Sequence, residues 1–151
     1  MKKTEVYSYF TVESAGDHHD ALGFIPADNS DFDPAELTKL LGIKPFRARK
    51  LGEPRRNGHG LYPASVWSGC RQESPSLDAA EQCARIAEKL RPLAPQLKEF
   101  KKRYAVDYTL IVVPHLANAV VPVLHFDRAV VRFCAEIGAE IGVDLRFEDD
   151  I

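Results

Sequence analysis

Cationic side chains gather in one short stretch of the chain, where together they could bind an anionic group. They are Arg47, Arg49, Lys50, Arg55 and Arg56. The planar guanidinium of arginine suits carboxylates and phosphates because it donates two parallel hydrogen bonds. Glycine, proline and asparagine between positions 52 and 58 predict turns, so this stretch is expected to be a basic loop. The alternative is a solvated loop that the acidic segments 28–36 and 144–150 partly neutralise.

The chain has one tryptophan, Trp67, at the end of a short apolar segment. We predict a strand over residues 62–68 with this side chain in the core, where its indole N–H would need an acceptor. A second interpretation makes Trp67 one wall of a pocket, with the basic loop folded over it.

Two histidines, His115 and His125, flank the turn between two predicted strands, 106–113 and 120–126. If they face each other across a hairpin, they are the best general-base candidates, because imidazole titrates near neutral pH. Their structural interpretation is as polar residues at strand ends. The adjacent pair His18-His19 has neither helical i, i+4 spacing nor a cysteine pair nearby, so we expect no metal site.

The cysteines offer little chemistry. Cys70 is predicted in a polar loop beside Arg71, a cation that could favour thiolate, but no histidine has a spacing that supports a nucleophile. Cys83 and Cys134 fall on apolar helical stripes and are expected as small core residues. Neither a Gly-x-Ser-x-Gly elbow nor a phosphate-binding glycine loop occurs. We therefore expect no catalytic residue and no cofactor.

Composition provides no overall attraction to nucleic acid or to an anionic membrane. The chain has 151 residues, of which 45% are hydrophobic and 28% charged, with a net charge of −2. This fits one globular domain over residues 1–151. No apolar run approaches the roughly 18 residues of a transmembrane helix, and no signal-peptide pattern is evident. Three cysteines without paired spacing then predict reduced thiols and a cytoplasmic location.

The first element expected is a strand over residues 4–13, where bulky and polar residues alternate. Even-numbered residues from 6 to 12 would face the core, and Tyr7 and Tyr9 would lie on an aromatic second face. Residues 14–30 are polar and contain glycine, so they are predicted to form a flexible loop.

The first helix has a complete set of end signals. Asp33 is the predicted N-cap, Pro34 occupies the first helical position, and Glu36 has the spacing of a capping box. Gly42 is the predicted left-handed stop. Its expected buried stripe consists of Leu37, Leu40 and Leu41.

A longer helical stripe runs from Leu77 to Tyr104, starting behind Ser76 or Asp78. Pro92 and Pro95 interrupt it, and an interior proline costs roughly 3 kcal/mol. We therefore expect a break near Arg91 and a second helix that starts at Pro92.

The remaining elements are two strands, a helix and a strand. Residues 106–113 are the clearest strand, and Pro122 places the strand at 120–126 at an edge or bulge. A helix is predicted from Asp127 to about Gly138, and the last strand carries Val143, Leu145 and Phe147 on one face.

One phrase occurs twice in the chain. Asp31-Phe32-Asp33-Pro34 and His125-Phe126-Asp127-Arg128 each precede a short amphipathic helix with a glycine stop. Either the fold is a ferredoxin-like pseudo-duplication, or both helices use ordinary capping residues; both explanations remain open. In each case we predict a single α+β domain in two layers, with a mostly antiparallel sheet of four to five strands and helices packed on one face.

The same residues resemble a known family. They are the 31–34 segment, the Leu-Leu-Gly-Ile-Lys-Pro exit at 40–45, the loop from Arg47 to Arg55, Trp67, and the closing segment from His125 to Asp144. Together they are similar to the bacterial DUF4279 family over residues 31–147. The resemblance implies a small soluble bacterial domain and no catalytic residue to carry over. The loop at 14–30 looks longer than the family pattern.

For function, we favour a non-enzymatic protein-binding module. Its partner would be another protein, acidic in character, engaged through the basic loop and the aromatic face of the first strand. An immunity or antitoxin-like role is the sharpest form of this hypothesis. The alternative is a small-molecule or anion site, regulatory or enzymatic, at Trp67, the basic loop and the two strand-end histidines. A homodimer through sheet edges or the aromatic face is a third expectation, and nucleic acid is disfavoured.

Overall fold

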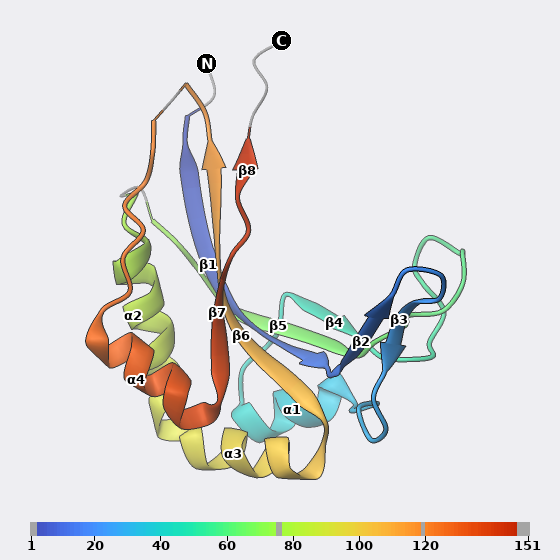
Figure 1. The fold of residues 1–151 in the computed structure, drawn as a ribbon. Coiled ribbons are helices and arrows are strands. Elements are labelled where there is room, and N and C mark those ends of the chain that lie inside the picture. Colours follow the sequence, from blue (N-terminus) through green and yellow to red (C-terminus); the bar gives the residue numbers. More distant parts are fainter. Residues whose placement is uncertain (1–2, 75–76, 119, 148–151) are drawn as a thin grey trace.

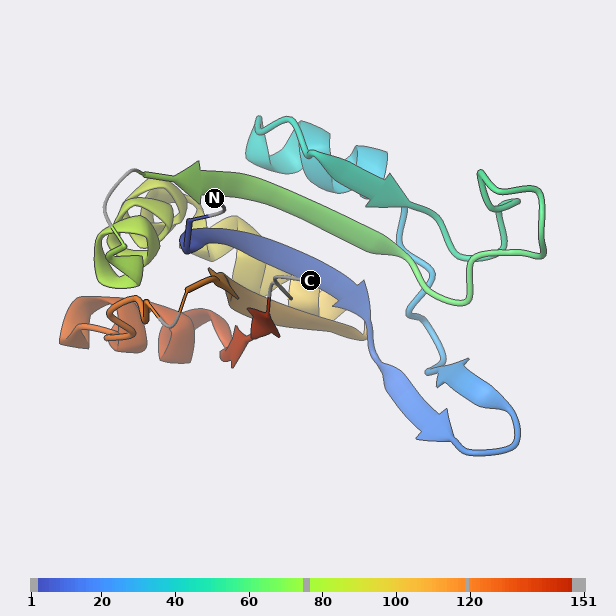
Figure 2. The same ribbon diagram turned by 90° about the horizontal axis from the view of Figure 1, so that it is seen from above.

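The computed structural model describes residues 3–74, 77–118 and 120–147. Within them the chain forms a strongly twisted sheet covered by helices on one face (Figures 1 and 2). The strands are β1 Glu5–Ser14, β2 Gly16–His19, β3 Gly23–Pro26, β4 Arg47–Arg49, β5 Val66–Glu73, β6 Val106–Leu116, β7 Ala139–Val143 and β8 Arg146–Phe147. The helices are α1 Pro34–Leu41, α2 Ala79–Leu90, the 3-10 turn η1 Arg91–Leu93, α3 Ala94–Arg103 and α4 Arg128–Ile137.

The main sheet has the order β4-β5-β1-β6-β7, and β8 extends the β7 side of β6. β1 pairs antiparallel with β5 and β6, β4 pairs antiparallel with β5, and β7 and β8 run parallel to β6. The parallel pair follows from α4, which crosses the sheet between β6 and β7 as parallel neighbours require. The predicted α+β class with a mostly antiparallel sheet is confirmed.

The core lies between the sheet and the helices. Even-numbered residues of β1 face it as predicted, with Val6, Phe10 and Val12 at most 3% exposed. Each helix adds apolar side chains to the same cluster, among them Leu37 of α1 and Phe133 of α4. One continuous core therefore joins every helix to this face of the sheet.

The helix caps form as the sequence predicts. Asp33 accepts a hydrogen bond from the Ala35 amide, and Asp127 accepts one from the Val130 amide. Gly42 and Gly138 end their helices at φ values of 67° and 70°, which residues other than glycine rarely adopt. The break between α2 and α3 also lies at Arg91, although a 3-10 turn separates the two helices and α3 itself begins at Ala94.

Two side chains of α1 depart from expectation. Glu36 does not close a capping box; its carboxylate instead binds Arg103 and the Tyr104 hydroxyl at the end of α3. Leu40 is 37% exposed, whereas Leu37 and Leu41 are buried. In both cases the position of α3, which the local sequence does not specify, decides what the α1 side chain contacts.

Two predicted segments are wrong in type. Residues 16–26 form a β hairpin of β2 and β3 rather than a loop, with His18 opposite Phe24. Residues 120–126 form no strand but only isolated bridges, from Val120 to Ala117 and from Val123 to Asp78. Pro122 lacks the N–H that a sheet ladder needs, so this segment runs beside the start of α2 instead.

The repeated phrase does not mark two equivalent halves. The strands on either side of α1, β3 and β4, belong to different sheets, whereas those on either side of α4, β6 and β7, are parallel neighbours in the main sheet. A true duplication would repeat the strand pairing. Ordinary capping residues therefore explain the phrase, since an aspartate N-cap and a glycine stop serve any short helix.

Candidate functional site

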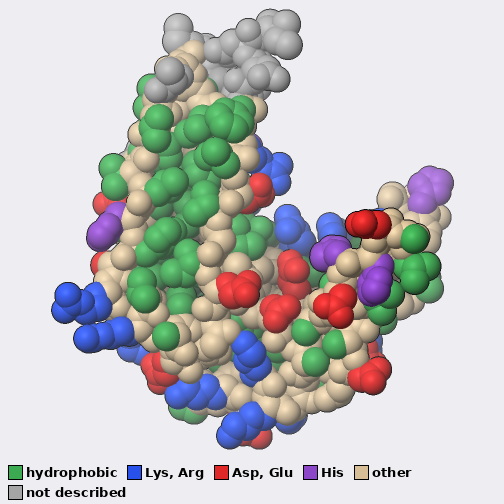
Figure 3. All heavy atoms as spheres, in the orientation of Figure 1, with side chains coloured by type: hydrophobic (Ala, Val, Ile, Leu, Met, Phe, Trp, Pro, Cys, Tyr) green, Lys and Arg blue, Asp and Glu red, His purple; other side chains and the backbone are tan. Residues whose placement is uncertain are grey.

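The face of the sheet opposite the helices is open, and it carries the aromatic side of β1. Tyr7, Tyr9 and Thr11 alternate with the core residues and therefore point to this face, but neighbouring side chains leave Tyr9 only 9% and Thr11 2% exposed. Figure 3 shows the surface hollowed between the long arm that ends in β8 and the β2–β3 hairpin, with charged side chains at its base. This concave open face is the part of the fold where a partner can contact many strands at once.

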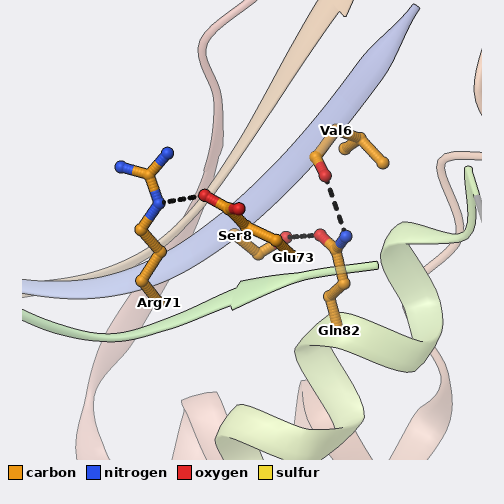
Figure 4. Close-up of polar contacts among 5 residues, drawn as sticks. All are labelled: Val6, Ser8, Arg71, Glu73 and Gln82. Carbon is orange, nitrogen blue, oxygen red and sulfur yellow. Dashed lines mark hydrogen bonds and ion pairs between the residues drawn. The ribbon is translucent and has the colours of Figure 1, made fainter. Parts of the chain in front are cut away.

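A bulge in β5 brings a cation onto the open face. The pairing of β1 with β5 shifts between Ser8 and Phe10, and Cys70 adopts φ of 58° there. Beyond the shift, Tyr7 lies opposite Glu73, so Arg71 shares the open face with it. The Arg71 guanidinium donates to Glu73 at 2.6 Å, as Figure 4 shows. On the core side of the same strands, Ser8 bonds to Gln82 of α2.

Aromatic rings form a continuous row across the open face. The rings of Tyr7 and Tyr9 are stacked with centroids 6.2 Å apart, and Phe46 meets Tyr9 edge-on at 5.2 Å. His115 continues the row at 6.0 Å from Tyr7. Arg71 lies above it, with Cζ 4.0 Å from the Tyr7 centroid and 5.7 Å from that of Phe46. Stacked rings of this kind present a rigid, partly apolar surface with a cation held in place.

One end of this row opens into a basic hollow of about 400 Å³. It is lined by Phe46, Arg47, Ala48, Arg49, Arg55, Arg56, Asn57 and Tyr62. Backbone hydrogen bonds from Gly52 to Tyr62 and from Arg55 to Gly60 shape the loop. Cζ of Arg49 is 5.4 Å from the centroid of the Tyr62 ring. The hollow thus combines four guanidinium groups with two aromatic rings.

The acidic segments do not neutralise this hollow within the part of the chain that the structure describes. Glu36 pairs with Arg103 at 2.6 Å and Asp144 with Arg146 at 3.0 Å. The hydrogen bond and charge of Asp144 raise the pKa of Arg146. Among described residues, no ion pair joins an acidic side chain to the four arginines of the hollow. Their charge remains available to a ligand.

The open face changes sign across its width. Glu13 of β1 lies opposite Asp107 of β6, and Thr109 lies beside Glu140 of β7. The β4–β5 side is therefore basic and aromatic, and the β6–β7 side is acidic. A partner that covered the whole face would need the opposite polarity, with its acidic part over the hollow.

The structure brings together only some of the residues that the sequence singled out. Arg47, Arg49, Arg55 and Arg56 share the hollow, whereas Lys50 does not line it. Trp67 is fully buried on the helix side, where its indole N–H donates to Thr38 Oγ1 at 3.0 Å. The core interpretation of Trp67 therefore holds, and it forms no wall of the hollow.

The two strand-end histidines are separated. His115 lies in β6 on the open face, whereas His125 is an exposed residue in the segment that leads into α4. The expected hairpin between them does not form, because residues 120–126 turn away toward α2. A second hollow, of about 750 Å³, includes His115 together with Tyr7, Arg71 and Glu73.

The cysteines are buried free thiols, and Cys70 lies in β5 rather than in a loop. Burial raises the pKa of Cys70, and it raises the pKa of Cys83 and of Cys134 to about 11. A raised pKa suppresses the thiolate, which is the nucleophilic form. Within the described residues, no three histidine, cysteine or carboxylate side chains lie close enough together to hold a metal ion.

Sequence reasoning missed three contributors to the open face, namely Phe46, Tyr62 and Arg71. Phe46 stands beside the basic loop and Tyr62 at its end, so aromatic residues flanking the cations were an available signal. Arg71 had no such signal, since its orientation depends on the bulge at Cys70.

The fold and this face define a class of small α+β domain with a core-forming helical layer and a concave, charged sheet surface. The chain belongs to the DUF4279 family, described as a domain of unknown function, whose model matches residues 4–148. The matched range is wider than the resemblance over 31–147 and spans the β2–β3 hairpin. No curated protein and no solved structure matches the chain at a significant level. None of the helices in the described residues is long and apolar enough to cross a membrane.

Proposed function

We propose that the chain is a non-enzymatic protein-binding module of the bacterial cytoplasm, and that its partner presents an acidic segment to the open face. The observation that carries this proposal is the basic hollow. Arg47, Arg49, Arg55 and Arg56 line it without an ion pair to any described acidic side chain. An immunity or antitoxin-like protein, which binds one acidic partner tightly, is the form of module that suits such a face.

Three features support a protein partner. Tyr7 and Phe46, which pack on the buried Tyr9, extend the contact surface beyond the hollow, as protein interfaces rich in tyrosine and arginine do. The face is open rather than a closed apolar pocket, which is the usual form of a small-molecule site. The buried thiols have raised pKa values and supply no nucleophile.

The test uses a fluorescein-labelled oligoglutamate peptide as the probe for an acidic segment. We expect saturable binding at low salt, measured by anisotropy, that weakens about 5-fold for each of Arg47→Gln and Arg55→Gln, since an exposed ion pair contributes up to about 1 kcal/mol. Lys50→Gln is the matched control, because it removes a charge from the same loop but outside the hollow. Equal effects of all three substitutions would show only non-specific attraction and would contradict the proposal.

A second measurement addresses the partner itself. Tagged protein in native lysate is expected to retain a partner that the Arg47→Gln/Arg55→Gln variant loses. If neither form retains a protein, and the arginines are replaceable without phenotype, the proposal fails.

A small anionic ligand is the second candidate function, because a hollow of about 400 Å³ is large enough for one. Trp67 takes no part in this version of the site, since it is buried on the helix side. Tripolyphosphate distinguishes the candidates: competition at micromolar concentration favours the small anion, whereas competition only at salt-like concentrations favours the acidic protein segment.

A further inference from the structure

An apolar stripe remains exposed along the opposite edge of the sheet from the basic hollow. Figure 3 shows it as a band of hydrophobic side chains along the long arm. Its members are Val120, Val121, Val123, Leu124, Val131, Val143, Leu145 and Phe147, each between 42% and 72% exposed. Their combined exposed surface is on the order of 800 Å², which is what each partner buries in a standard protein interface.

The stripe borders a strand with an unpaired edge. β7 is the last strand of the sheet, and no described strand pairs with its outer side. The Asp144 amide donates to the Val112 carbonyl of β6, so by alternation the backbone groups of Ala139, Ile141 and Val143 point outward. Edge strands are usually protected by charged side chains or proline. β7 has one charged residue, Glu140, and the three residues with outward backbone groups are apolar.

We propose that this edge pairs with β7 of a second copy of the chain, antiparallel and with a two-fold axis at Ile141. Ile141 would then lie opposite its own equivalent, with Ala139 of each copy opposite Val143 of the other. All outward N–H and C=O groups of these residues find partners in this register. The two apolar stripes come together beside the new strand pair, on the helix side of the joined sheet.

The register also keeps like charges apart. The axis places Glu140 of one copy opposite Gly142 of the other, so like charges are not directly opposed.

The dimer joins the two sheets edge to edge. The open face of each copy then continues into that of the other, with the acidic β6–β7 sides at the centre and the two basic hollows at the outer ends. This interface uses neither the hollow nor the aromatic row, so it stands independently of the proposed function.

The register can be tested with one pair of substitutions at Gly142. A Cβ there meets only Thr109 Cγ2 at 3.5 Å, an ordinary contact, so a side chain fits the monomer. Gly142→Glu would place two carboxylate pairs against Glu140 of the other copy, and Gly142→Lys would create two opposite-charge pairs. In sedimentation equilibrium we expect the wild type and Gly142→Lys to have the mass of a dimer. For Gly142→Glu we expect a dimer dissociation constant at least 10-fold higher.

Further variants separate the interface from folding. Val143→Lys/Phe147→Lys is expected to give a folded monomer, with an unchanged circular dichroism spectrum. Leu61→Lys changes an exposed leucine outside the stripe and should remain a dimer. A monomeric wild type across the concentration range, or equal masses for the two Gly142 variants, would overturn the proposal. If the wild type is a monomer, the apolar stripe would instead be a candidate contact surface for a different protein.

Discussion

The guanidinium of Arg71 lies over the ring of Tyr7, with Cζ 4.0 Å from the ring centroid. These residues lie on strands that pair out of regular register, and they meet only because Cys70 is bulged. In a regular strand Arg71 would point toward the core, where an unpaired charge is costly. The bulge in β5 therefore decides that Arg71 lies on the open face.

The bulge makes an unusual ranking of substitutions testable. Left-handed backbone costs a side-chain residue roughly 1–2 kcal/mol, so Cys70→Gly is expected to be more stable than Cys70→Ala by about 1 kcal/mol. Cys70→Val should be the least stable of the three although it is the most apolar. Urea unfolding measures this order. Cys83, in the regular helix α2, is the control and should show alanine above glycine; the same order at both positions would contradict the account.

Gly69 is required by the ring of Trp67 rather than by its backbone angle. A Cβ at Gly69 would lie 2.5 Å from Trp67 Cη2, and that ring is fully buried. Gly69→Ala should therefore destabilise the protein by roughly 1–3 kcal/mol, as overpacking does. Gly142→Ala, also in a strand but with space for a Cβ, should change the unfolding free energy by less than about 1 kcal/mol. Similar losses for both would show that strand glycines, not the ring contact, matter.

Ser8 and Gln82 form a buried pair that ties β1 to α2 (Figure 4). Ser8 Oγ donates to Gln82 Oε1 at 2.7 Å, and Gln82 Nε2 donates to the Val6 carbonyl at 2.9 Å. Gln82→Leu leaves buried polar atoms unpaired and should cost roughly 2–3 kcal/mol. Adding Ser8→Ala to Gln82→Leu should cost less than the sum of the single substitutions. Strict additivity in this double-mutant cycle would mean that the two residues do not interact.

Alkaline pH should destabilise the fold through the buried thiols. Burial raises the pKa of Cys83 from 9.0 to about 11. The unfolded chain therefore loses this proton first, so the stabilisation present below pH 9 is lost as the pH rises toward 11. Cys83→Ala should lower stability at neutral pH through lost packing, yet show a shallower decline between pH 9 and 11. Thermal melting at each pH measures this decline. An equally steep decline in the Cys83→Ala variant would assign the effect to other groups.

Much of the fold could be predicted because it depends on neighbours in sequence. Asp33 and Asp127 cap their helices, and the break at Arg91 follows from Pro92 and Pro95. The predicted strand at 120–126 does not form, because apolar composition alone does not provide a pairing partner and because Pro122 lacks the backbone N–H donor that a sheet needs. The hairpin at 16–26 was missed because β2 is polar throughout and the short apolar run of β3 ends in proline, so neither strand shows polar–apolar alternation.

The candidate site was predictable as a set of charges but not as a surface. Arg47, Arg49, Arg55 and Arg56 were identified from composition and do share one hollow. Trp67 and His125 were grouped with them, and the structure places both elsewhere. The side of a sheet on which a residue lies depends on pairing and bulges, which involve strands distant in the chain.

The sequence by itself determined the aspartate caps and glycine stops of α1 and α4, most of the buried stripes and the basic character of the loop, because capping, periodicity and charge act over a few residues. The tertiary structure alone decided that Arg71 joins Tyr7, that Glu36 binds Arg103 rather than its own helix end, and that β7 lies at an apolar edge. Each of these features depends on contacts between segments far apart in the chain, and local sequence patterns do not predict such contacts.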